Sequence, residues 1–232
     1  MTLTALLGLL LIGLLPAAST PRTAAPSTPL LPALESYLDA REAEFDRISE
    51  DRRAVLRPLA VWIAEARAAG RPIDLVFVCT HNSRRSHMAQ LWAKAAAIRE
   101  GIDVTTWSGG TEATAFNPRA VAAMDRAGFN VVRTTGNTNP IYHVTLGESL
   151  PIQTCFSKPF DAAPNPTAGI AAVMVCGDAD RRCPIVPGAA GRFAMPFVDP
   201  KVSDGTPEET ATYDDRCAQI ARELLWIMSE AS

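Results

Sequence analysis

The feature that most constrains the fold is segment 73–79, with the sequence IDLVFVC, which is almost wholly apolar and ends at a short polar loop. A brief run without alternating polar residues is typical of a strand buried on both faces of a parallel sheet. A helix-forming sequence follows at 86–100 and stops at Gly101. This order of strand, loop and helix predicts an α/β domain, with the loop at the carboxyl end of a central strand.

The chain continues to alternate between strands and helices. We expect further strands at 102–107, 131–132 and 170–176, and further helices at 117–128 and 206–229. Asn117 is a favourable cap ahead of Pro118 at the first helical position, and Thr206 with Glu209 forms a predicted capping box. Together these segments predict a three-layer α/β domain, 73–230, built on a parallel sheet of four strands.

An N-terminal helical extension is predicted at 33–70. Apolar residues at helical spacing, with charges between them, indicate an amphipathic helix that ends near Pro58. A shorter helix is expected at 59–69 and stops at Gly70. We expect these helices to cover part of the main domain.

Residues 1–32 combine an apolar run at 3–15 with a linker rich in Pro, Ala, Ser and Thr. Small residues at 17–19 follow the run as in a cleavage site, so the run is a candidate export signal or membrane anchor. However, no basic residue precedes the run, which is also shorter than the ~20 residues of a membrane span. The protein is therefore expected in the cytoplasm if this segment is no signal, and in the periplasm or tethered to the membrane if it is one.

The composition excludes several classes of function. The 232 residues carry a net charge of -3, so we expect no nucleic-acid partner and no stable membrane partner beyond the candidate N-terminal anchor. Five cysteines, an odd number in a chain of this length, do not form a disulfide framework. Three histidines without ligand spacing predict no metal site. Any anion that the chain binds must be held by a local site.

The loop 79–86, with the sequence CTHNSRRS, has the composition of an oxyanion site that contains a nucleophile. Backbone N–H groups of the loop and of the following helix N-terminus converge on one point, where they stabilise both a Cys79 thiolate and a bound oxyanion. The alternative interpretation of Cys79 is a buried core cysteine. The expected oxyanion-binding residues are Thr80, His81, Asn82, Ser83, Arg84, Arg85 and Ser86.

Three side chains of this loop have distinct expected roles. Arg85 can bind two oxygens of the anion through its planar fork, which a lysine could not do as well. The Ser86 hydroxyl can donate a hydrogen bond to the Cys79 sulfur, and Asn82 can brace the loop.

Residues 76–92 (VFVCTHNSRRSHMAQLW) resemble the phosphate loop of low-molecular-weight protein tyrosine phosphatases, and equally that of the arsenate reductases that share their fold. The resemblance continues through SGGTEA at 108–113, NPRAV at 117–121, CGDADRRCP at 176–184 and the pair at 199–200. It covers roughly 73–230 and implies the phosphatase I-like fold.

The resemblance also bears on individual loop residues. It implies that Ser108 helps to hold Asn82. The chain departs from the family at His81, where a glycine is usual, and at Arg84, which is expected to add positive charge near the mouth of the site.

A general acid follows from the same resemblance. Members of this family protonate the leaving oxygen with the Asp of an Asp-Pro pair on a loop, which corresponds here to Asp199 and Pro200. Without the resemblance, this pair would be interpreted as an ordinary turn.

Two additional thiols make the arsenate reductases the closer match. The resemblance implies that Cys79 forms an adduct with arsenate, that Cys176 attacks Cys79 and releases arsenite, and that Cys183 then attacks Cys176. No cofactor is expected to be bound, and thioredoxin is the expected reductant of the final disulfide. The alternative is that Cys176 packs in the core and Cys183 is an incidental loop thiol.

The alternative function is a low-molecular-weight protein tyrosine phosphatase that hydrolyses phosphate monoesters through a phosphocysteine. It would need only Cys79, Arg85 and Asp199. However, Lys201 and Val202 stand where tyrosine-specific members carry aromatic residues, and this favours a small oxyanion over a phenol ester. A third hypothesis, a non-catalytic oxyanion or redox sensor, is disfavoured by the complete catalytic set.

Overall fold

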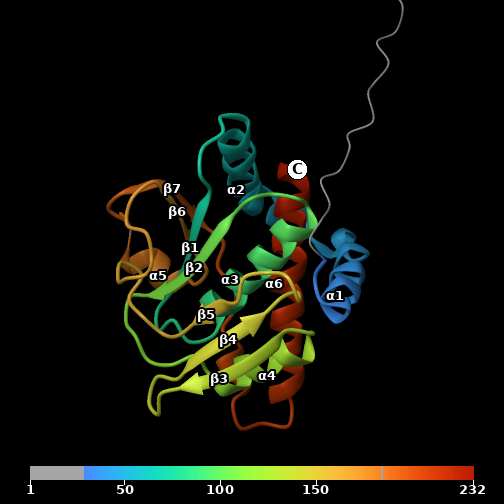
Figure 1. The fold of residues 1–232 in the computed structure, drawn as a ribbon, viewed down its shortest axis with the longest axis vertical. Helices are drawn as coiled ribbons and strands as arrows, with labels where there is room; N and C mark the ends of the chain where they lie inside the picture. Colours follow the sequence, from blue (N-terminus) through green and yellow to red (C-terminus); the bar gives the residue numbers. More distant parts are fainter. Residues whose placement is uncertain (1–28, 184) are drawn as a thin grey trace, which may run out of the picture.

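A computed structural model describes residues 29–183 and 185–232, and its centre is a parallel sheet of four strands (Figure 1). The strand order is β2-β1-β6-β7. The strands are β1 (Asp74–Cys79), β2 (Thr105–Gly110), β6 (Ile170–Met174) and β7 (Ala189–Ala194). The α/β class and the four-stranded parallel sheet predicted from the sequence are confirmed.

The two inner strands are buried, as their apolar sequences predict. Every residue of β6 is buried, and so is every residue of β1 after Asp74. Helix α3 (Arg85–Arg99) follows the loop after β1 and packs on β1 and β2. Because β1 and β6 are neighbours and parallel, the loops at their carboxyl ends meet at one edge of the sheet.

A second, antiparallel sheet was only partly anticipated, as the extended stretch at 131–132. It contains β3 (Asn130–Thr135), β4 (Ile141–Thr145) and β5 (Gln153–Cys155), and it follows α4 (Pro118–Arg126). Asn117 caps α4 as predicted, since its side chain accepts a hydrogen bond from the Arg119 N–H. The chain leaves β5 toward Lys158, whose backbone oxygen accepts from Gly110 N–H and brings this segment to the end of β2.

The N-terminal extension forms α1 (Pro32–Glu42), the short 3₁₀ turn η1 (Phe45–Arg47) and α2 (Glu50–Ala68). The predicted helix end near Pro58 is wrong, because Pro58 lies inside α2. The break falls earlier, where the Ser49 side chain accepts from the Arg52 N–H and starts α2. Buried apolar residues on both sides of the proline, including Leu56 and Ile63, keep the helix continuous despite the lost hydrogen bond.

The last helix, α6 (Glu209–Ala231), runs along most of the domain and packs against α1, α2, α3 and α4 (Figure 1). The predicted capping box is wrong. The Thr206 hydroxyl donates to the Ser203 oxygen, while the Glu209 carboxylate accepts from the Gly205 N–H. A turn after the 3₁₀ segment η2 (Pro200–Ser203) thus takes the place of the expected first helical turn.

The candidate signal or anchor at 1–32 falls almost wholly outside the described residues. Within 29–183 and 185–232, no helix combines the length and the apolar character that crossing a membrane requires.

Candidate active site

Cys79 is the last residue of β1 and lies at the base of the loop that leads into α3. Only 4% of its surface is exposed. The loop is pressed against β2 so closely that a Cβ atom on Gly110 would come within 2.7 Å of the Asn82 nitrogen. The glycine at this position therefore allows the loop to fold over the end of the sheet.

A chain of hydrogen bonds leads through the loop to the Cys79 sulfur. Asn82 is buried with a left-handed backbone, φ 42°, and its Oδ1 accepts from the Lys158 N–H at 2.9 Å. Its Nδ2 donates to Ser86 Oγ at 2.9 Å, and this oxygen lies 3.1 Å from Cys79 Sγ. Because the serine oxygen accepts from Asn82, its own proton can point to the sulfur and stabilise a thiolate.

Ser108 has a different partner from the one expected. Its Oγ lies 3.1 Å from His87 Nδ1, so Ser108 does not contact the Asn82 side chain directly, and the backbone N–H of Lys158 holds that side chain instead. His87 stacks on Phe116 with ring centroids 4.1 Å apart. Ser108 therefore orients the first turn of α3 rather than the loop amide.

The buried His87 predicts a loss of stability in acid. Burial, with the nearby charge of Lys158, lowers the pKa of His87 from 6.5 to about 3. Between these values the unfolded chain binds a proton that the folded chain excludes, so the free energy of unfolding falls as pH falls, by up to about 1.4 kcal/mol per pH unit. Urea unfolding between pH 7 and pH 5 should show a shallower pH dependence for His87→Gln than for the parent. Equal slopes would contradict this assignment.

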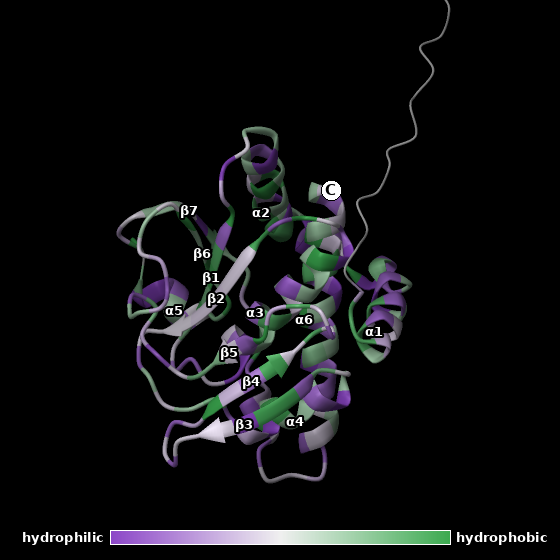
Figure 2. Cartoon of the chain, viewed as in Figure 1, coloured by the Kyte–Doolittle hydropathy of each residue, from purple (hydrophilic) through white to green (hydrophobic). Residues whose placement is uncertain are grey.

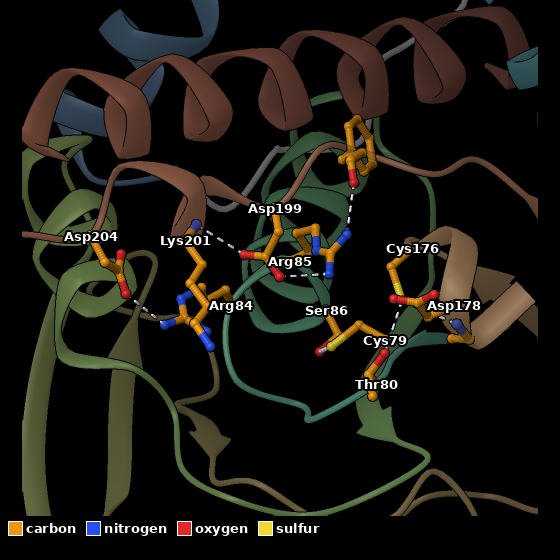
Figure 3. Close-up of polar contacts among 12 residues, drawn as sticks. Cys79, Thr80, Arg84, Arg85, Ser86, Cys176, Asp178, Asp199, Lys201 and Asp204 are labelled. Carbon is orange, nitrogen blue, oxygen red and sulfur yellow. Dashed lines mark hydrogen bonds and ion pairs between the residues drawn. The ribbon is translucent and has the colours of Figure 1, made fainter. Parts of the chain in front are cut away.

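Arg85 binds the loop that carries the candidate acid. Its Nη1 donates to the Phe197 oxygen at 2.8 Å and its Nη2 to Asp199 Oδ2 at 2.7 Å. Figure 3 shows the Asp199 carboxylate turned toward the Arg85 guanidinium. The two residues that the sequence predicted for anion binding and acid catalysis are thus brought together from positions 114 apart. An incoming oxyanion has to share or replace these contacts to use the arginine fork.

The Asp199 carboxylate also fixes its own loop. Its Oδ1 accepts from the Lys201 N–H at 3.1 Å, and this caps η2 directly before Pro200. Upstream, the Phe197 N–H donates to the Val175 oxygen at 3.1 Å and ties the loop to the end of β6. We call residues 197–204 the acid loop.

Arg84 holds the other end of the acid loop rather than lining the mouth of the site as free charge. Its Nε donates to the Tyr213 hydroxyl at 2.6 Å and its Nη2 to Asp204 Oδ2 at 3.1 Å. Tyr213 donates in turn to Asp204 Oδ1, and burial raises the pKa of Tyr213 to about 12, so the phenol keeps its proton. Asp204 therefore offsets the charge that Arg84 was expected to add.

The remaining loop residues also contact other parts of the protein. The His81 side chain is half-exposed, with its Nε2 3.9 Å from a Glu112 oxygen. The backbone carbonyl of Ser83 accepts from the Asn117 N–H at 2.8 Å. Thr80 Oγ1 lies 3.6 Å from Cys176 Sγ and links the loop to the next strand end.

Cys176 lies beside this loop because β6 is hydrogen-bonded to β1, with Met174 opposite Val78. It is 1% exposed and caps the short helix α5 (Gly177–Arg182), where its sulfur accepts from the Ala179 N–H at 3.3 Å (Figure 3). Cys183 follows α5 directly and is half-buried. Burial raises the pKa of the Cys183 thiol, and the charge of Arg192 opposes this shift.

Cys155 ends β5, and Cys217 lies in α6. Both are fully buried, and burial raises the pKa of each thiol to about 12, which keeps them protonated and unreactive. All five cysteines are free thiols. In the described ranges 29–183 and 185–232, no group of three or more His, Cys, Asp or Glu side chains is placed to hold a metal ion.

A parallel α/β sheet with a cysteine and an arginine in one loop at a strand end defines the phosphatase-like class of cysteine-dependent oxyanion proteins. The model of the low molecular weight phosphotyrosine protein phosphatase family matches residues 74–138. Arsenate reductases from Bacillus licheniformis and Bacillus subtilis are each 31% identical to this chain over 142 residues, which are 61% of this chain and 84% of theirs. The chain therefore belongs to the low-molecular-weight phosphatase superfamily that includes these arsenate reductases.

A solved structure is also similar to this chain. It is a thioredoxin-dependent arsenate reductase from Corynebacterium glutamicum, with 18% sequence identity and a TM-score of 0.38, and the match covers 84% of this chain and 86% of that one.

Proposed function

We propose that this chain reduces arsenate to arsenite through a relay of three cysteines, Cys79, Cys176 and Cys183. The observation that carries the proposal is the meeting of two buried thiols at one sheet edge. Thr80, next to Cys79 in the chain, has its hydroxyl 3.6 Å from Cys176 Sγ, and Cys183 ends the helix that Cys176 begins. A phosphatase needs one thiol at this edge, whereas a reductase needs all three.

In the first step, the Cys79 thiolate attacks arsenic in an arsenate held by the loop N–H groups and Arg85. An S–As bond forms, and an arsenic-bound hydroxyl takes up a proton and leaves as water as its As–O bond breaks. The Ser86 hydroxyl lies 3.1 Å from the Cys79 sulfur and can donate a hydrogen bond to the attacking thiolate. Arsenate has to compete with Asp199 for the Arg85 fork, since both of the donors described above are engaged in this structure.

In the second step, the Cys176 thiolate attacks Cys79 Sγ. The new S–S bond forms as the S–As bond breaks, and the electron pair stays on arsenic, which leaves as arsenite. Cys183 then attacks Cys176, so that Cys79 is released as a thiolate and the disulfide moves to the Cys176–Cys183 pair. A dithiol protein of the thioredoxin type supplies the two electrons and two protons that reopen this disulfide.

The last exchange requires α5 to unwind. Cys176 and Cys183 flank a six-residue helix, and a rise of 1.5 Å per residue separates their Cα atoms by about 10 Å, beyond the ~7 Å limit of a disulfide. Helix α5 is short and mostly hydrophilic (Figure 2), and Arg192 holds it through Asp180 and the Cys183 oxygen. Few buried apolar contacts oppose its opening, and Gly177 offers a hinge.

A second candidate function, hydrolysis of phosphate monoesters, is favoured by one specific observation. The Asp199 carboxylate lies 2.7 Å from Arg85, on a loop that can present a proton to an ester oxygen bound by the same arginine. In this reaction Cys79 forms a phosphocysteine, which water hydrolyses without help from Cys176.

Parallel assays of the parent protein separate the two functions. With thioredoxin, thioredoxin reductase and NADPH, arsenate should cause continuous NADPH oxidation and release one arsenite per NADPH. Hydrolysis of p-nitrophenyl phosphate should be much less efficient in kcat/KM. Efficient ester hydrolysis without thioredoxin-dependent arsenite formation would replace the reductase by the phosphatase.

A further inference from the structure

Arg52 of α2, in the N-terminal extension, contacts the acid loop. The Arg52 guanidinium lies over the Phe197 ring, 4.9 Å from its centroid. A guanidinium over an aromatic face is attracted by the negative charge of the ring, most strongly where water is excluded. Phe197 is only 4% exposed, so this contact is shielded from solvent.

Glu223 of α6 fixes the orientation of that guanidinium. Arg52 Nε and Nη2 both donate to Glu223 Oε2, at 2.9 and 2.7 Å, and Gln219 donates to Glu223 Oε1 at 2.9 Å. The Glu223 side chain is 3% exposed, so these partners take the place of the water that would otherwise solvate its carboxylate. A lysine could supply the charge, but not the flat surface that faces the ring.

Phe197 in turn supports the reactive groups. Its oxygen accepts from Arg85 Nη1 at 2.8 Å, and Asp199, two residues further on, accepts from Arg85 Nη2. A continuous series of contacts therefore runs from Glu223 through Arg52 and Phe197 to Arg85 and Asp199. Arg52 lies before residues 74–138, the range that the family model matches.

We infer that Arg52 is a positioning residue, which holds Phe197 so that the acid loop keeps Asp199 and Arg85 in their working relation. The helical extension is then a part of the catalytic apparatus and not only a cover. The consequence for the reaction rests on the proposed role of Asp199 as general acid, whereas the positioning of Phe197 does not.

The test combines two readouts on the full chain. Hydrogen exchange should reveal at least a tenfold loss of protection at the Phe197 N–H, which bonds Val175, in Arg52→Met. The same variant should hydrolyse phenyl phosphate, a poor leaving group, about tenfold more slowly, with a much smaller loss on p-nitrophenyl phosphate. Arg57→Met is the matched control, because Arg57 lies on the same helix and pairs with the exposed Glu50.

Two further variants keep the result interpretable. Arg52→Met leaves the buried Glu223 carboxylate without the guanidinium that it binds, so Arg52→Met/Glu223→Met removes both charges and should still lose protection at Phe197. Asp199→Asn calibrates the acid, with an expected loss of roughly 10²–10⁴-fold on phenyl phosphate.

Unchanged protection at Phe197 in the folded double variant would overturn the inference. The inference would also be overturned if the variant loses protection at Phe197 but slows equally on phenyl phosphate and p-nitrophenyl phosphate, provided that Asp199→Asn shows its expected loss. If Asp199→Asn has no leaving-group dependence while Phe197 protection is lost, the positioning stands and the acid assignment fails.

Discussion

Replacing Cys79 by serine should abolish arsenate reduction and ester hydrolysis, with turnover reduced by about 10⁴-fold or more. A serine hydroxyl is hardly ionised at neutral pH, and the hydrogen bond from Ser86 cannot offset that difference. For arsenate the loss is chemical as well, since an oxygen at position 79 cannot form the S–S bond that expels arsenite. The measurement is arsenite release in the thioredoxin-coupled assay, beside p-nitrophenol release.

Oxyanion binding should survive in the same variant. The backbone N–H groups, Asn82 and Arg85 are unchanged, so phosphate should raise the melting temperature of Cys79→Ser about as much as that of the parent. Cys217→Ala is the matched control, because Cys217 is a buried thiol in α6 whose sulfur contacts Trp92 and Met124, and the change should leave turnover intact. Near-parent activity in Cys79→Ser would refute the central role of this cysteine.

The parts of the fold that the sequence predicts are those coded locally. The apolar run that forms β1, the cap at Asn117 and the helix after the loop all follow from neighbouring residues. The helix end predicted near Pro58 was wrong because the packing of α2 on α6 outweighs the one hydrogen bond that the proline removes. The capping box predicted at Thr206 does not form, because the Thr206 hydroxyl donates to the Ser203 oxygen in η2 instead.

The same distinction between local and distant contacts holds for the candidate site. Cys79, Asn82, Arg85 and Ser86 share one loop, so their roles could be proposed from spacing and the chemistry of a helix N-terminus. Asp199 could be proposed only through the resemblance to a family.

The contributors to the site that were missed reach it from distant segments. The Lys158 N–H holds Asn82 from 76 positions away, and Phe197 meets Arg85 from 112 away. Arg52 and Glu223 are 171 positions apart. No local pattern marks such contacts. Glu223 lies on the face of α6 that is otherwise lined by apolar side chains. A charged residue at such a position in the helical pattern is a signal that is visible in the sequence.

The second large effect is expected for the relay cysteines. Cys176→Ser should release no arsenite, because nothing then attacks the Cys79 adduct at the neighbouring strand end. Serine can preserve the contact with the Thr80 hydroxyl, so the loop should keep its structure. Cys183→Ser should release about one arsenite per chain and then stop, trapped as the Cys79–Cys176 disulfide, because the third exchange is missing.

Both variants should hydrolyse p-nitrophenyl phosphate at near-parent rates, since water completes that reaction at Cys79 alone. The difference between the two substrates separates a chemical role from a structural one, because damage to the loop would slow both reactions. Quenched-flow counting of arsenite, with thiol alkylation to identify the trapped disulfide, measures each step. Continuous arsenate turnover by Cys176→Ser would exclude the relay, and a reductant that attacks Cys79 directly would then have to replace Cys176 in the second step.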